Sequence, residues 1–228
     1  MIKLLQTNCL LRQLYFNKPE MERLLMLSSL FSVGLTVARI FYTGEWLFAW
    51  LSWNLFLAII PYVISRFAMR HPAWVESSFN FALLFICWLL FIPNSFYIIT
   101  DLFHLEIRIR IPLWYDLALI FSFAWNGILF GVLSVRQMEK MVQLKLPLIT
   151  ELQFAVPVML LNSFGIYIGR YLRYNTWDVI ANPFQLTKDI VYLLLHPVQN
   201  RFDWGMIGCY AVFMTLIYLA VKRMSRAL

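Results

Sequence analysis

Six runs of predominantly apolar residues follow one another along the chain, separated by shorter polar segments. Their bounds are 24–42, 46–64, 79–99, 113–135, 152–171 and 204–221. A helix needs about 20 such residues to cross the hydrocarbon core of a bilayer, so each run is long enough to span it. The pattern predicts an all-α integral membrane helix bundle of about six transmembrane helices.

Two other segments have the mixed pattern of an amphipathic helix. Residues 1–22 place leucines among polar residues, which is typical of a helix at the membrane surface. We therefore divide the chain into a cytoplasmic amphipathic segment, 1–22, and a single six-span domain, 23–228. The long connection at 172–203 contains the other candidate, residues 185–196, which is too short to span. Its apolar face would comprise Leu186, Ile190, Leu193 and Leu194.

The third run is interrupted by Pro93-Asn94. Proline removes a backbone donor and clashes with the preceding turn, so we expect a third helix that is kinked or broken there. If the ten residues after Asn94 are helical, Asn94, Tyr97, Asp101 and His104 recur at spacings of three, four and three. They would then share one face and end in a carboxylate and an imidazole about one turn apart.

The fourth run begins with a carboxylate and continues with two small residues. Asp116 lies in its first turn, where an ionised group should face a partner or water. Gly127 and Gly131 are four residues apart, which predicts a close helix–helix contact.

Composition and charge agree with a membrane protein. The 228 residues are 61% apolar and 14% charged, with a mean hydropathy of +0.70, whereas soluble domains have roughly 45–50% apolar and about 25% charged residues. The formal charge of +7 would suit nucleic acid in a polar chain, but in this one we assign it to orientation in the membrane and expect no nucleic-acid partner.

The basic residues divide unequally between the two sides that six spans define. Twelve Lys and Arg lie on the side of the termini and seven on the other, which predicts cytoplasmic termini. All five aspartates lie on the outer side, and six of its seven basic residues are arginine. We therefore expect the polar site on that side.

Guanidinium groups suit phosphate or carboxylate, because they present a planar fork of donors. The predicted ligand-binding residues are Arg39, Asn94, Tyr97, Arg170, Arg173, Asn175 and Asp178. Candidate catalytic groups are Asp101, His104 and Asp116, and no Cys/His spacing indicates a zinc site. The alternative is structural: Arg39, Arg170 and Arg173 pair with Asp101, Asp116 and Asp178 and hold the helices together.

Several of these residues fall in motifs that resemble one family. The motifs are Trp53–Ala58 with Pro61, Leu90–Leu105, Trp114–Asp116, Gly165–Arg170 with Arg173, Asn175, Trp177 and Asp178, and Asn182-Pro183. Together they resemble the bacterial multi-pass membrane proteins catalogued as domain of unknown function 1361. The resemblance implies an integral membrane architecture and supplies no activity and no cofactor.

Three hypotheses about function follow. In the first, the outer site binds or moves an anionic lipid or solute, with the bilayer and an anionic headgroup as partners. In the second, the protein is a membrane-embedded hydrolase or transferase that acts on a lipid headgroup, with Asp101, His104 and Asp116 as metal ligands or as general acid and base. In the third, it is a structural or accessory subunit whose polar network fixes helix packing.

Overall fold

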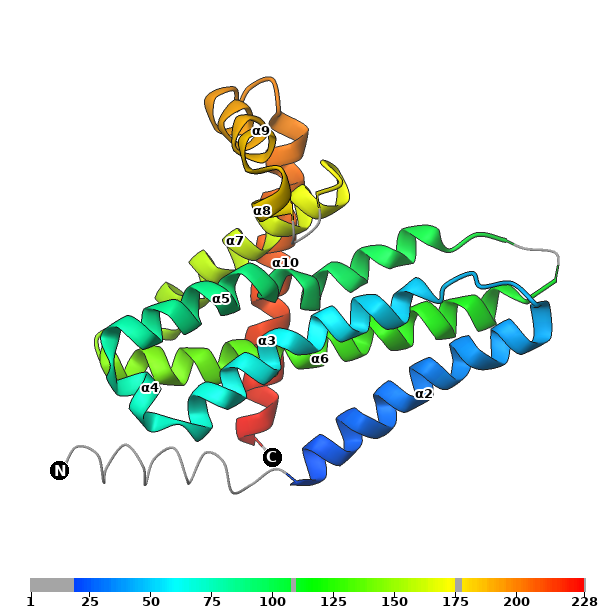
Figure 1. Ribbon diagram of the computed structural model, residues 1–228, viewed down its shortest axis with the longest axis horizontal. Coiled ribbons are helices and arrows are strands. Elements are labelled where there is room, and N and C mark those ends of the chain that lie inside the picture. Colours follow the sequence, from blue (N-terminus) through cyan, green and yellow to red (C-terminus); the bar gives the residue numbers. More distant parts are fainter. Residues whose placement is uncertain (1–18, 108–109, 175–177, 228) are drawn as a thin grey trace. The chain divides into compact units, whose positions relative to one another are not determined.

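The structure is a computed structural model that describes residues 19–107, 110–174 and 178–227 (Figure 1). In these residues the regular secondary structure is helical, with no strand. Six of the described helical segments are long and apolar enough to cross a membrane: Glu20–Thr43, Trp50–Arg70, Ser78–His104, Leu113–Lys145, Glu151–Arg170 and Arg201–Met224. The prediction of an all-α bundle with about six transmembrane helices is confirmed.

The chain forms two compact units, Met1–Lys145 and Leu146–Leu228. The helices of the first are α2 (Pro19–Thr43), α3 (Trp50–Arg70), α4 (Pro72–Glu76), α5 (Ser78–Tyr97), the 3₁₀-helix η1 (Ile98–His104) and α6 (Leu113–Lys145). The helices of the second are α7 (Glu151–Arg170), α8 (Asp178–Ala181), α9 (Pro183–Leu195) and α10 (Arg201–Ala227). The predicted division into 1–22 and 23–228 stays a prediction, since residues 1–18 lie outside the described residues.

In the first unit α6 is the central helix, and α2, α3, α5 and η1 pack against it (Figure 1). The two predicted glycines make the contact with α5 close. A Cβ on Gly127 would lie 2.6 Å from the carbonyl oxygen of Ser95, and one on Gly131 would lie 2.7 Å from the ring of Phe96. No larger side chain fits there without a shift of the helices, so the predicted contact between helices is confirmed.

The third helix was expected to be kinked or broken at Pro93-Asn94. It is not broken there, and a kink at this position stays a prediction. The α-helix continues through Pro93 to Tyr97 and becomes a 3₁₀-helix only at Ile98. A proline removes one intrahelical hydrogen bond, and a packed membrane helix can accommodate that loss. Asn94 lies inside this helix, and its Nδ2 donates to the carbonyl oxygen of Phe91 at 3.1 Å. In the 3₁₀ segment residues three apart are aligned, so Asp101 and His104 lie on one side.

In the second unit α7 packs against α10, and α9 covers one end of the pair. Leu193 of α9 is buried with Tyr167 and Ile207, and the indole Nε1 of Trp204 donates to the carbonyl oxygen of Leu193 at 3.2 Å. The predicted short helix at 185–196 is therefore present. Of the residues that we expected on its apolar face, Leu186 and Leu193 are buried and Leu194 is 53% exposed.

Candidate functional site

Four helix ends meet at one end of the first unit: the end of α2, the start of α3, η1 and the start of α6 (Figure 1). Two connections close this end, the turn after Thr43 and the segment between η1 and α6. An exposed ion pair joins them, with Arg110 Nη1 3.7 Å from Glu45 Oε1. The polar residues of the first unit that we predicted as a site lie in or just inside this end.

Arg39 and Asp116 form a buried ion pair between α2 and α6. Arg39 Nε donates to Asp116 Oδ1 at 2.9 Å, and Nη2 donates to Oδ2 at 3.4 Å, so the carboxylate lies along one edge of the guanidinium. The two residues are 2% and 1% exposed. The opposite charges neutralise each other inside the bundle, and this pair is one of the Arg–Asp pairs that the structural alternative expects.

Phe48 covers the other face of the Arg39 guanidinium. The Arg39 Cζ lies 5.0 Å from the centre of the ring, within the range of a cation–π interaction. The backbone of Phe48 has a φ of 68°, which is strained for a bulky residue. The buried ring packs in the core with Leu51 and Leu55, so tertiary packing holds the strained turn in place.

Asp101 lies one layer away, on the side of η1 that faces α3. It is fully buried, and its Oδ2 accepts a hydrogen bond from Asn54 Nδ2 at 3.0 Å. One turn nearer the end of the bundle, the ring of His104 meets that of Trp50 edge to face, with 5.1 Å between centres. The antiparallel pairing of α3 with α5 and η1 therefore brings Asp101 and His104 to a common partner helix.

The remaining candidates of the first unit are less enclosed. Asn94 and Tyr97 are half-buried near the end of α5. Asn94 makes its hydrogen bond within its own helix, as described above. The structure thus brings Arg39 to Asp116, and Asp101 and His104 to α3.

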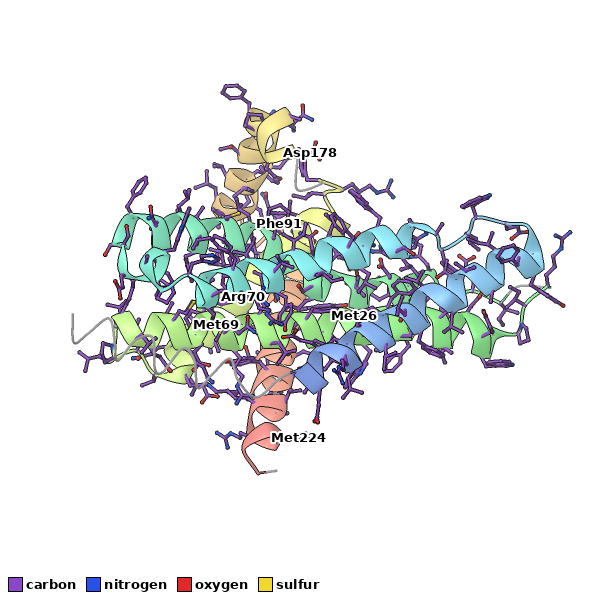
Figure 2. The ribbon with its side chains drawn as sticks, turned by 60° about the horizontal axis from the view of Figure 1, so that its bottom comes forward. Met26, Met69, Arg70, Phe91, Asp178 and Met224 are labelled. Carbon is purple, nitrogen blue, oxygen red and sulfur yellow. The ribbon has the colours of Figure 1, made fainter. Side chains whose placement is uncertain are left out.

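The other three described candidates belong to the second unit. Arg170 is the last residue of α7 and is half-buried, while Arg173 is exposed in the following turn, with a φ of 60°. Asp178 begins α8 (Figure 2), and its Oδ1 accepts a hydrogen bond from Asn182 at 3.4 Å. Asn175 lies outside the described residues. A single site that joins Arg39 to Arg170 and Arg173 stays a prediction.

The sequence analysis did not predict Asn54, Trp50 or Phe48 as site residues. They contact the candidate residues Asp101, His104 and Arg39, respectively. A polar Asn54 inside an apolar run was the available signal, since such residues in a span usually have a partner. In the second unit it missed the hydrogen bond from the Tyr174 hydroxyl to Asp189 Oδ2 at 2.7 Å. That bond, with a smaller effect of burial, raises the pKa of Tyr174 above its ordinary value.

Within the part of the chain that the structure describes, no group of three or more His, Cys, Asp or Glu side chains could hold a metal ion. Of the predicted catalytic groups Asp101, His104 and Asp116, the carboxylate of Asp116 is engaged by Arg39.

Comparison with known proteins decides the family. A family described as "Protein of unknown function (DUF1361)" matches residues 53–219. The chain belongs to the DUF1361 family. The match extends from α3 into α10 and includes Asn54, Asp101 and Asp116, whereas Arg39 precedes it. No curated protein and no solved structure matches the chain.

Proposed function

We propose that this DUF1361 protein is a multi-pass protein of the bacterial inner membrane, with both termini cytoplasmic, that binds the phosphate group of an anionic lipid on the outer side. An even number of spans returns the chain to its starting side, and the twelve-to-seven division of basic residues supports cytoplasmic termini. The lipid-binding end is the one formed by α9 and the end of α7.

The observation that carries the proposal is the second apolar face of α9. Leu186 and Leu193 pack inward, but Phe184, Val191 and Leu195 form another stripe, at spacings of seven and four, that is exposed. Phe184 is 91% exposed and Leu195 is 70% exposed. A helix that is packed on one face and apolar on a second is suited to lie in the interfacial layer of a bilayer, with the second face toward the acyl chains.

Arg173 precedes a residue that is hydrogen-bonded to this helix. The hydrogen bond from Tyr174 to Asp189 ties the turn after α7 to α9, which supports a position of Arg173 near the proposed interface. Gln185 Nε2 also donates to Asp189, at 3.0 Å, so both carboxylate oxygens have partners within the unit. An exposed guanidinium next to an interfacial helix is the arrangement that binds a lipid phosphate with a fork of donors.

The experiment is a native mass-spectrometry titration of the detergent-solubilised protein with phosphatidylglycerol and with phosphatidylcholine. Arg173→Gln should weaken retention of phosphatidylglycerol about fivefold, since a basic residue at an anionic surface contributes about 1 kcal/mol. The matched control is Arg223→Gln, which removes the same charge from an exposed position near the other end of α10.

Equal retention by wild type and Arg173→Gln, or equal losses in Arg173→Gln and Arg223→Gln, would contradict the proposal. A third arm distinguishes the source of the phosphate. Inorganic phosphate should leave the bound lipid in place, whereas displacement by it would assign the site to a soluble anion.

A second candidate function is favoured by the buried pair of Arg39 and Asp116, which supports a structural or accessory role for the first unit. In this role the polar end fixes the packing of α2 on α6 and catalyses no reaction. Function lost by Asp116→Asn should then follow loss of folded protein, and normal stability with lost function would reject it.

A further inference from the structure

One side of α2 is polar along most of its length. Its polar side chains recur at spacings of three and four residues, which places them on one face of the helix. They are Ser28, Ser32, Thr36, Arg39 and Thr43. Ser32, Thr36 and Arg39 are buried, whereas Met26, on another side of the helix, is exposed (Figure 2). Because α2 packs against α6, we call this contact the α2–α6 seam.

Asn126 is the residue of α6 at the middle of the seam. Its Nδ2 lies within hydrogen-bond distance of three acceptors: the carbonyl oxygens of Ser28 (3.1 Å) and Ser122 (2.9 Å) and the hydroxyl of Ser32 (2.9 Å). The Ser32 hydroxyl itself donates to the carbonyl oxygen of Ser28, so it acts as an acceptor toward Asn126. Rotating the amide would place Oδ1 against these acceptors, so the contacts fix its orientation.

Two buried polar atoms of the seam, and a third on Ser29 next to Ser28 in α2, make no hydrogen bond to the described residues. They are Ser29 Oγ, Asn126 Oδ1 and Arg39 Nη1. A buried polar group without a partner is unfavourable, because its hydrogen bonds to water are lost and lipid offers no partner. Asn126 cannot repair this by rotating its amide, and Arg39 is held by Asp116 and Phe48. Three such atoms in or next to one interface indicate a common partner.

We propose that the α2–α6 seam binds ordered water inside the membrane span. One water site lies at Asn126 Oδ1 and Ser29 Oγ, and another lies at Arg39 Nη1. Water supplies the donor that Asn126 Oδ1 needs and the acceptor that Arg39 Nη1 needs, and buried waters occupy polar sites of this kind. Ser29 is the eleventh of the 25 residues of α2, so the hydrated seam extends from the end of the bundle to about the middle of the span.

This hydrated seam is independent of lipid binding by the second unit. Water is then a structural ligand of the span. Hydrogen bonds through bound water, in addition to side-chain packing, hold α2 on α6. Water at Arg39 also completes the hydrogen bonding of the buried ion pair, which otherwise leaves one nitrogen of the guanidinium unsatisfied.

The test is radiolytic hydroxyl-radical labelling of the full chain in ¹⁸O-labelled water, where radicals form from bound water next to the side chain that they modify. Phe123 lies between Asp116 and Asn126 along α6 and is 0% exposed, and the matched control is Phe96, which is 1% exposed and packs against Gly131. Phe123 should incorporate ¹⁸O several-fold faster than Phe96. Equal rates in the wild-type protein would overturn the proposal.

A variant gives a second readout. Ser29→Ala removes one proposed water partner with little change in volume, so labelling of Phe123 should fall toward the rate of Phe96. Faster labelling of Phe123 than of Phe96 that is unchanged by Ser29→Ala would overturn the water site at Ser29.

Discussion

Replacing Asp116 with asparagine should destabilise the protein by about 3–5 kcal/mol, because it leaves the charge of Arg39 buried without its counter-charge. Both side chains are almost completely buried, and the shorter of their two contacts is 2.9 Å. Bulk water therefore cannot replace the lost carboxylate charge. Asparagine keeps the shape and one oxygen acceptor, so the loss reports on charge rather than on packing.

The reverse substitution and the double variant separate the pair from its surroundings. Arg39→Gln should cost a similar amount, because it leaves a buried carboxylate without its counter-charge. The double variant Arg39→Met/Asp116→Leu should recover most of the loss, since well-packed apolar replacements of buried ion pairs are often neutral or stabilising. The losses of the single variants Arg39→Met and Asp116→Leu should therefore add up to far more than the loss in the double variant.

The assay is equilibrium unfolding in mixed detergent micelles, followed by circular dichroism. The exposed pair of Arg110 and Glu45 provides the control, because an ion pair at 3.7 Å in contact with water contributes at most about 1 kcal/mol. A loss in Asp116→Asn no larger than in Glu45→Gln would refute the reasoning. A loss in the double variant that equals the sum of the losses in Arg39→Met and Asp116→Leu would also refute the reasoning.

Three further predictions concern other contacts. Gly127→Ala should destabilise the first unit by about 1–3 kcal/mol in the same unfolding assay, because its Cβ would lie 2.6 Å from the carbonyl oxygen of Ser95. Gly34→Ala, with nothing within 4 Å of the new Cβ, should instead stabilise α2 by about 0.5–1 kcal/mol, and a loss as large as at Gly127 would contradict the packing argument. Tyr174 should titrate above its ordinary pKa of 10.0, and Asp189→Asn should lower the midpoint in ultraviolet difference titration against Tyr174→Phe. Because folding raises this pKa, the contribution of the hydrogen bond is full below 10.0 and is lost as the pH rises through the raised value, so a midpoint that Asp189→Asn leaves unchanged would count against the bond.

The spans could be predicted from the sequence because hydrocarbon imposes one length and one composition on every helix that crosses it. The residue at which the third span changes from α-helix to 3₁₀-helix could not be predicted. Proline marks a missing donor at residue 93, but the α-helix tolerates that loss and ends after Tyr97. The 3₁₀ segment makes tertiary contacts such as the one between Asn54 and Asp101, and local sequence does not contain such contacts.

The pairing of charges illustrates the same limit. Three arginines and three aspartates gave several possible pairs, and helical periodicity alone cannot choose among them. Which aspartate pairs with Arg39 depends on which side of α2 packs against α6. The serine and threonine residues of α2 lie on that side, where Ser32 contacts Asn126 of α6. This stripe was visible in the sequence as small polar residues three and four apart within an apolar run. It would have predicted the seam, although not the atoms left without partners.

The structural role and the lipid-binding role rest on different residues, so they can be separated by one pair of measurements. Asp116 is engaged inside the first unit, and Arg173 is exposed in the second. Asp116→Asn should lower the yield of folded protein while the phosphatidylglycerol bound per folded molecule stays constant. Arg173→Gln should do the opposite, because an exposed residue contributes little to stability. If both variants lowered lipid retention per folded molecule, the buried pair would belong to the binding site, and the assignment of lipid binding to the second unit alone would be wrong.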